Sequence, residues 1–246
     1  EDEATTDDPH RVRFIKYADG LQEPLGLAVH PDEDAKRRAA IAEGRSWNGP
    51  VHVAQRGEVS RMVDLDDDWR VDRVETVCDD WAISGNYHEY TFGPAFDANG
   101  DLWLTLNRPF GSEPFGKKDW RGWAIRVDEN GAMHAEAAGL RSPCGVEMGP
   151  DGNLYYTDNQ GEWCGASKMS IIERGDFHGH PWGIASTKRP ESLVDFPGEI
   201  PDGIPMPEAA ERIPDFKMPV VWFPYNKCGQ SPGEVVWDVD GTLGPF

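Results

Sequence analysis

The sequence predicts an all-β protein, and more specifically part of a β-propeller of the six-bladed type. Twenty-seven Gly and twenty Pro residues separate short runs rich in Val, Trp, Tyr and Phe, which is typical of short strands joined by tight turns. One pattern also recurs, because residues 21–32 and 140–151 agree at Leu, Pro, Gly, Pro and Asp. Internal repeats of this kind indicate an architecture of stacked, similar units.

Each copy of the repeat follows the same order of features. A Gly where backbones crowd is followed by alternating apolar residues, an Asp-Gly or Asn-Gly turn and a second alternating strand. A further copy spans residues 91–105, and another begins at Gln230. The second strands are predicted at residues 101–105 and 153–157, and the one convincing helix at residues 32–43.

Residues 1–246 are interpreted as one partial propeller domain covering about three to four blades. A Pro-rich insertion at about residues 190–219 has too few apolar residues to fold alone, so we expect it to wrap the surface between the copies that begin at 140 and 230. Propellers need about 4 to 8 blades, and the sequence ends within a blade at residues 244–246. The remaining blades are therefore expected from the rest of a longer chain or from another chain.

The net charge indicates which classes of binding partner are disfavoured. There are 24 basic and 44 acidic residues, a formal net charge of −20, which disfavours nucleic acid and anionic lipid and suits a salty or extracellular setting. No apolar run approaches the length of a membrane span, and residues 1–9 lack the basic and apolar parts of a signal peptide.

The chain has four cysteines, at positions 78, 144, 164 and 228, and no two of them are spaced as Cys-x-x-Cys. This argues against a structural zinc site or covalent haem in this segment. Disulfides are the preferred interpretation. Cys144 and Cys164 flank one hairpin-like unit, so a bridge between them is predicted, and with it export to the periplasm or the cell exterior. Two buried free thiols are the alternative.

Residues 139–182 carry a specific resemblance. They contain Arg141-Ser-Pro-Cys-Gly145, a Pro-Asp-Gly turn, Gln160-Gly161 after the second strand, and His178-Gly-His-Pro181. The segment resembles the soluble quinoprotein glucose and sorbosone dehydrogenases, whose unit has Arg-Asn-Pro-x-Gly, the same turn, Gln-Gly and Gly-x-Tyr-Gly-x-Pro. It resembles still more closely the propeller domains of membrane-bound dehydrogenases described in planctomycete-type bacteria, which are often joined to cytochrome c modules.

The resemblance implies a site that holds pyrroloquinoline quinone and calcium. Arg141 matches the arginine that faces substrate and cofactor, while Ser142 replaces an asparagine that contacts the cofactor. The backbone carbonyls of Gly161 and Glu162 match the calcium-binding pair, and Asp158 adds a carboxylate to this oxygen-rich segment. His88 falls about two residues from the position of the catalytic base, a role that suits an imidazole because its pKa lies near neutrality.

Each of these residues also has a structural interpretation. His88 could be a loop histidine bonded to a carbonyl, and Arg141 could pair with Glu147 or Asp158. Residues 158–162 could form a turn that binds its own backbone. Trp163 and Trp182 are candidates for a sugar pocket, while the histidines at 178 and 180 are interpreted as packing residues.

Three functions are consistent with these features. The first is a quinoprotein-like oxidoreductase that oxidises a sugar, or a related alcohol or aldehyde, and passes electrons to a partner such as a cytochrome c. The second is a non-catalytic propeller that binds carbohydrate or protein beside an electron-transfer module, which the replacement by Ser142 favours. The third is a calcium-dependent hydrolase of the lactonase type, which needs several inward carboxylates where Asp158 and Glu147 alone are too few.

Overall fold

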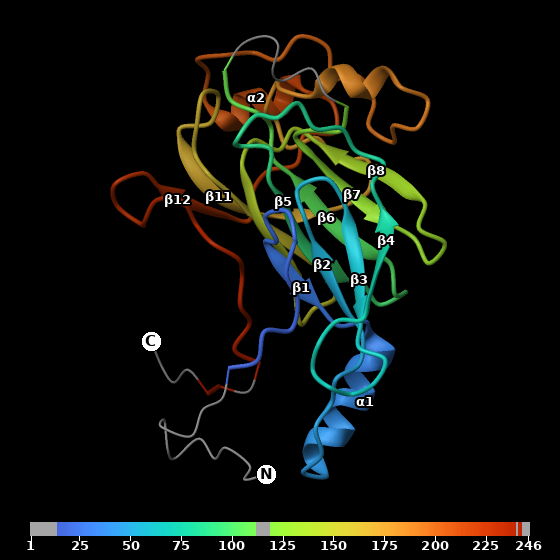
Figure 1. The fold of residues 1–246 in the computed structure, drawn as a ribbon. Helices are drawn as coiled ribbons and strands as arrows, with labels where there is room; N and C mark the ends of the chain where they lie inside the picture. Colours follow the sequence, from blue (N-terminus) through green and yellow to red (C-terminus); the bar gives the residue numbers. More distant parts are fainter. Residues whose placement is uncertain (1–13, 112–118, 240, 243–246) are drawn as a thin grey trace.

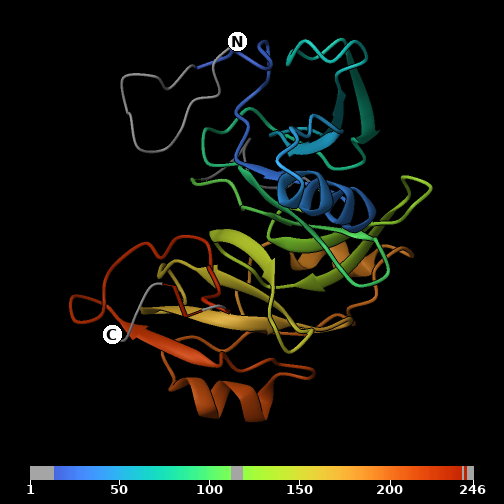
Figure 2. The ribbon, with the colours of Figure 1, turned by 90° about the horizontal axis from the view of Figure 1, so that it is seen from below.

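A computed structural model describes residues 14–111, 119–239 and 241–242 of the chain. Residues 1–9, where no signal peptide is expected, and residues 244–246, where the last predicted blade breaks off, lie outside this part. Three antiparallel sheets of four strands each follow one another in chain order (Figures 1 and 2). We call them blades one, two and three.

The twelve strands are grouped as the repeat predicts. Blade one contains β1 (Gly26–Ala28), β2 (Val51–Ala54), β3 (Val59–Val63) and β4 (Arg73–Cys78). Blade two contains β5 (Thr91–Phe96), β6 (Leu102–Leu106), β7 (Trp123–Val127) and β8 (Met133–Ala138). Blade three contains β9 (Pro143–Met148), β10 (Leu154–Asp158), β11 (Ala166–Ile172) and β12 (Val221–Pro224). The predicted second strands are β6 and β10, so these predictions are confirmed.

The first strands of the three blades lie side by side, because β5 contacts both β1 and β9. Glycine makes this close approach possible. A Cβ atom at Gly26 would overlap the backbone carbonyl of Gly93, and one at Gly93 would lie 2.8 Å from the carbonyl oxygen of Trp103 and 3.0 Å from Val146. At the same repeat position of blade three, a Cβ at Gly145 would lie 2.7 Å from the side chain of Glu234. Gly26, Gly93 and Gly145 thus each lie in the first strand of their blade, and none of them has room for a Cβ atom.

The core lies between the sheets. All five residues of β6 are buried, and Trp123 and Ile125 on the neighbouring strand β7 are fully buried as well. The indole of Trp123 also donates a hydrogen bond of 3.1 Å to the carbonyl of Gly183. Burying aromatic and aliphatic side chains on both faces of a strand ties adjacent sheets together.

The fourth copy forms no strand within residues 229–239 of the described chain, but it packs against the first two strands of blade three, β9 and β10. Thr157 Oγ donates to the carbonyl of Gly233 at 2.7 Å, and the Trp237 ring meets the Tyr155 ring edge-on with centroids 4.8 Å apart. This segment therefore takes the place where the first strand of a further blade would pack.

Helices are few. The predicted helix is α1 (Pro31–Ala42), which begins after His30, whose ring nitrogen accepts the N–H of Asp32. Two short helices were not predicted, a 3₁₀ helix at Ile184–Lys188 and α2 at Met206–Arg212. In the described residues, no helix is long and apolar enough to cross a bilayer.

The Pro-rich stretch lies within blade three, between β11 and β12, rather than after it. It also contacts blade two, because Ser192 bridges to Ala135 on β8. Phe216 bridges to Phe177, which in turn bridges to Ala138 on β8. The insertion therefore ties blade three to blade two.

The predicted disulfide is wrong, because Cys144 and Cys164 are both free thiols, as are Cys78 and Cys228. Cys144 on β9 pairs with Thr157 on β10, while Cys164 lies just before β11, on the other side of β10. Strands two positions apart are about 9.6 Å apart, which exceeds the roughly 7 Å limit for Cα atoms in a disulfide. The inference of export from this bridge therefore loses its basis.

Candidate functional site

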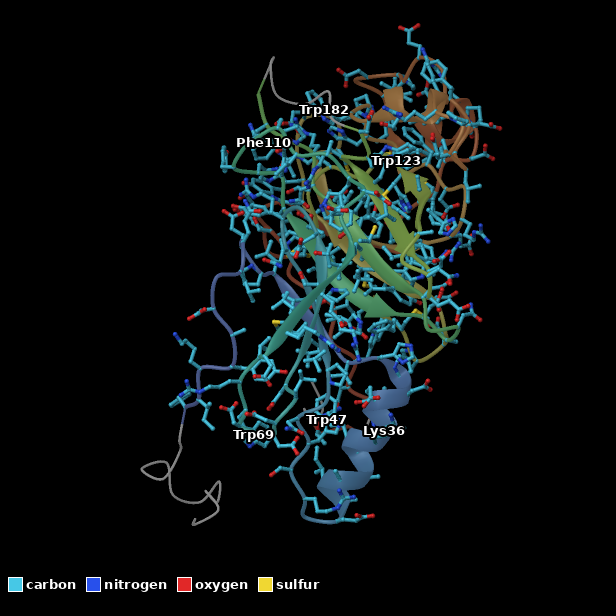
Figure 3. The ribbon with its side chains drawn as sticks, turned by 45° about the vertical axis from the view of Figure 1, so that its right-hand side comes forward. Lys36, Trp47, Trp69, Phe110, Trp123 and Trp182 are labelled. Carbon is cyan, nitrogen blue, oxygen red and sulfur yellow. The ribbon has the colours of Figure 1, made fainter. Side chains whose placement is uncertain are left out.

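The topology brings the candidate residues to one end of blades two and three. His88 precedes the first strand of blade two and Arg108 follows the second. Arg141 precedes the first strand of blade three and Glu162 follows the second. Because these strand pairs are antiparallel, the start of one strand and the end of the next meet at the same edge. Figure 3 shows Phe110 and Trp182 at this end, away from the end that carries α1.

His88 is held in one orientation. Its Nδ1 lies 2.8 Å from the backbone carbonyl of Arg108 and its Nε2 lies 3.0 Å from Oγ of Ser142. A carbonyl can only accept, so Nδ1 carries the hydrogen in the neutral ring and Nε2 is the acceptor. The imidazole stacks on Phe110, with centroids 3.6 Å apart and an interplanar angle of 23°.

The surroundings of His88 favour the neutral imidazole. Burial lowers the pKa of His88, and the nearby Arg141 and Arg108 guanidiniums lower it further, while the hydrogen bond to the Arg108 carbonyl opposes them. A neutral imidazole with a defined acceptor nitrogen can take a proton from a hydroxyl group.

Asp158 fixes the turn that carries Arg141 and Ser142. Its carboxylate accepts the backbone N–H of Ser142 at 2.7 Å and that of Arg141 at 3.1 Å. The ammonium of Lys168 lies 3.3 Å away, and both side chains are buried. These three donors engage both carboxylate oxygens, so Asp158 positions the backbone that carries Arg141 and Ser142.

Two guanidiniums converge on one carboxylate. Glu162 accepts a hydrogen bond from Arg141 Nε at 2.9 Å with one oxygen and forms an ion pair with Arg108 through the other. Arg141 therefore pairs with neither of its two sequence-predicted partners. A Cβ atom at Gly161 would overlap the Arg141 guanidinium, so the glycine allows the arginine to lie against the backbone.

Aromatic rings hold both arginines in place. The Arg108 guanidinium lies 4.9 Å from the Phe110 ring and 4.9 Å from the Trp182 ring, and that of Arg141 lies 4.7 Å from Phe110. Guanidiniums stack favourably on aromatic faces. His88 and the two arginines therefore share the Phe110 ring as a common platform.

His180 lies beside the Glu162 carboxylate, beyond ordinary hydrogen-bond distance. Its Nε2 lies 3.7 Å from Glu162, and burial lowers the pKa of His180. His180, then Arg141 and Arg108, hold the pKa of Glu162 well below its ordinary value. Glu162 is therefore a carboxylate at any physiological pH.

Several buried polar atoms of the site have no partner among the described residues. They are Asn107 Oδ1, Arg108 Nε, His180 Nε2 and Trp182 Nε1. Buried polar groups are normally hydrogen-bonded, and two neighbouring guanidiniums, of which Arg108 keeps a buried Nε–H without a partner among the described residues, suit an anionic ligand rich in oxygen. A ligand that carries carboxylates, such as pyrroloquinoline quinone or an acidic substrate, fits this donor set, whereas the carboxylates of Asp158 and Glu162 already have basic partners.

The structure brings the predicted residues His88, Arg141, Ser142 and Glu162 together. Beside them lie three residues that the sequence analysis did not propose for the site: Arg108, Phe110 and His180. One signal was available for Arg108 and Phe110, because they follow the second strand of blade two as Glu162 follows the second strand of blade three. Of the two tryptophans proposed for a sugar pocket, Trp182 lies in this cluster. Trp163 instead lines a separate cavity of about 380 Å³ with Met206, Met218 and Trp222.

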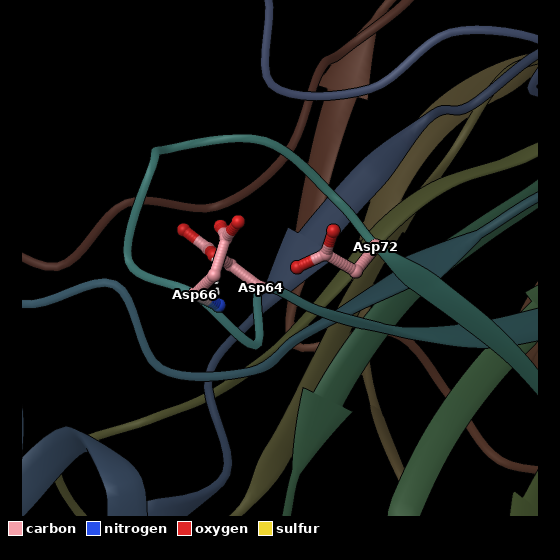
Figure 4. A group of neighbouring side chains, drawn as sticks. All are labelled: Asp64, Asp66 and Asp72. Atoms are coloured by element: carbon pink, nitrogen blue, oxygen red, sulfur yellow. Dashed lines mark hydrogen bonds between the residues drawn. The ribbon is translucent and has the colours of Figure 1, made fainter.

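A second group of acidic residues, Asp64, Asp66 and Asp72, lies in the loop between β3 and β4 (Figure 4). Asp64 accepts the backbone N–H groups of Asp67 and Trp69 at 2.9 and 2.8 Å, and Asp72 accepts that of Leu65 at 2.7 Å. These carboxylates therefore hold the loop through its own backbone. Trp69 places this loop at the opposite end from Phe110 (Figure 3).

No protein-family model matches the chain, and no curated protein matches it. Solved structures are similar in fold. A glucose dehydrogenase is 19% identical with a TM-score of 0.50, covering 84% of this chain and 59% of its own. Another glucose dehydrogenase is 21% identical with a TM-score of 0.51, covering 84% and 60%. The apo form of the soluble aldose sugar dehydrogenase of Escherichia coli is 18% identical with a TM-score of 0.50, covering 85% and 61%.

The chain is therefore part of a β-propeller. Its fold is the one seen in these glucose and aldose sugar dehydrogenases, and it spans about three fifths of their length.

Proposed function

We propose that this chain is part of a quinoprotein-like oxidoreductase that oxidises a sugar, or a related alcohol or aldehyde, with His88 as general base. The observation that carries the proposal is a buried histidine with a fixed acceptor nitrogen, stacked on the same ring as two guanidiniums. Base catalysis needs the first feature and an anionic cofactor needs the second. The fold shared with sugar dehydrogenases supports the same substrate class.

In this proposal the chain's own residues have separate roles. Nε2 of His88 accepts the proton of the substrate hydroxyl, after the Ser142 hydroxyl has turned away or by passing the proton through it. Arg141, with Ser142 beside it, orients the cofactor, and Asp158 keeps both at the start of β9. When bound, pyrroloquinoline quinone supplies the hydride acceptor.

The site offers calcium fewer protein ligands than the sequence analysis expected. The Asp158 and Glu162 carboxylates are both engaged by basic groups, so only the backbone carbonyls of Gly161 and Glu162 are proposed as protein ligands for a calcium ion. Location in the periplasm or outside the cell, and a cytochrome c as electron acceptor, belong to the same proposal.

A non-catalytic scaffold is the second candidate, and one observation favours it. Ser142 occupies the acceptor nitrogen of His88, which blocks direct access by a substrate hydroxyl. The lactonase alternative gains nothing, because the site carboxylates Asp158 and Glu162 are already paired.

Dye reduction separates dehydrogenase from scaffold. A version of the protein that contains all its blades is mixed with pyrroloquinoline quinone and calcium, and a panel of neutral and acidic sugars is added. The proposal expects quinone-dependent reduction with at least one sugar. Tight quinone or sugar binding without any reduction would instead support the scaffold.

A further inference from the structure

We propose that Arg108 and Arg141 form a carboxylate-binding site that Glu162 occupies from within the chain, and that the ligand which replaces Glu162 is a sugar acid. The inference rests on the proposed function in naming a sugar, and deepens it by assigning the substrate class. Arg108, the central residue, was not among the residues that the sequence singled out.

The positive charges of Arg108 and Arg141 are only partly neutralised by nearby carboxylates. Two guanidiniums face the one carboxylate of Glu162, while the neighbouring Asp158 is paired with Lys168. The Nε atom of Arg108 is buried without a partner among the described residues. An unpaired buried donor on a charged group is costly, so a second anionic oxygen would be bound favourably.

Glu162 is the component that can leave. Its side chain is 54% exposed, whereas those of Arg108 and Arg141 are 5% and 12% exposed. Phe110 and Trp182 hold the guanidiniums from the sides, but the described contacts of the Glu162 side chain are only with Arg108, Arg141 and His180. Rotation of this one side chain would therefore open both arginines to a ligand carboxylate.

The surroundings suit a sugar ring attached to that carboxylate. The Trp182 indole N–H and the side-chain amide oxygen of Asn107 are buried and have no hydrogen-bond partner in the described parts of the chain. They offer a donor and an acceptor for hydroxyl groups. His88 stacks on the same Phe110 ring as the arginines, so a ligand anchored by its carboxylate would bring its hydroxyls towards the proposed base.

The carboxylate that replaces Glu162 could belong to a sugar acid or to the quinone itself. Calorimetric titration distinguishes these two ligands. Glucuronate, its neutral counterpart glucose, and pyrroloquinoline quinone are each titrated into the 246-residue chain without turnover. We expect glucuronate to bind at least about tenfold tighter than glucose, and Glu162→Gln to tighten glucuronate binding about tenfold by removing the internal competitor. Glu173→Gln is the matched control, because Glu173 is similarly exposed and pairs with Lys217 away from the site.

Arg108→Gln should weaken glucuronate binding about tenfold or more, while Arg108→Lys should retain part of it. Because Arg108 is buried, circular dichroism must first show that each variant folds; the Glu162→Gln result does not depend on them.

Equal binding of glucose and glucuronate, or unchanged affinity in Glu162→Gln, overturns the inference. If saturating quinone excludes glucuronate and Glu162→Gln tightens the quinone instead, the carboxylate belongs to the cofactor and the sugar-acid assignment falls. Binding without turnover keeps this test apart from the proposed function. Reduction of dye by neutral sugars alone would leave that function standing while removing the acidic substrate.

Discussion

The Ser142 hydroxyl lies 3.0 Å from Nε2 of His88, the nitrogen that the proposed oxidation needs as its proton acceptor. The Arg108 carbonyl fixes the hydrogen on Nδ1, so the serine donates and the histidine accepts. Ser142 therefore lies between the proposed base and any substrate that approaches this nitrogen, and in the proposed oxidation the serine has to move or relay the proton.

Replacing His88 by Ala should lower turnover about 10²-fold or more, the usual contribution of a general base. Dye reduction with saturating sugar, in the presence of quinone and calcium, measures this. His134→Ala is the control, since this half-exposed histidine pairs with Asp128 outside the site. Nearly unchanged turnover in His88→Ala would remove the base assignment.

Acid should destabilise the protein partly through His52. Burial, then the charges of Arg61 and His30, lowers the pKa of His52 from 6.5 to about 4, against the opposing charge of Glu75. Since only the unfolded chain binds the proton between these values, the free energy of unfolding should be unaffected above about pH 6.5 and fall on acidification to about pH 4.

The loss through His52 should reach roughly 2 to 3 kcal/mol. Urea unfolding of wild type and His52→Gln across this range measures it, and the variant should show a shallower fall. Parallel pH curves would contradict the assignment to His52.

Gly26→Ala should destabilise the protein by about 1 to 3 kcal/mol or more, because the added methyl group would overlap the Gly93 carbonyl between blades one and two. Gly165→Ala serves as the comparison, since a Cβ there meets no atom within 4 Å. Thermal unfolding of the two variants should differ clearly. Equal melting temperatures would mean that the two first strands are not packed this closely.

The cysteines should behave as thiols. Cys228 is exposed, while Cys78 and Cys164 are buried, and burial raises the pKa of Cys78 to about 11. A thiol reagent should therefore label Cys228 rapidly in the native protein and the buried pair only after unfolding. Mass spectrometry without reductant should find no peptide that links Cys144 to Cys164; such a peptide would restore the predicted bridge.

The fold could be predicted because its determinants are local. Each blade carries its own glycine, turn and alternating strand, so the repeat at residues 21–32, 91–105 and 140–151 was visible before any contact was known. The disulfide could not be predicted in the same way. Cys144 and Cys164 are close in the sequence, but this does not reveal that β10 lies between β9, which carries Cys144, and β11, which Cys164 precedes.

The sequence by itself determined the repeated blades, a helix predicted at residues 32–43, and the choice of His88, Arg141 and Glu162 as candidate site residues, since periodicity and motif spacing depend only on neighbours along the chain. Only the tertiary structure decided what these residues do to one another. Arg108, 54 positions from Glu162 in the sequence, pairs with the same Glu162 carboxylate as Arg141. Asp158 accepts the backbone N–H groups of Arg141 and Ser142. Such pairings depend on which strand ends meet, and that is set by the packing of one blade against the next.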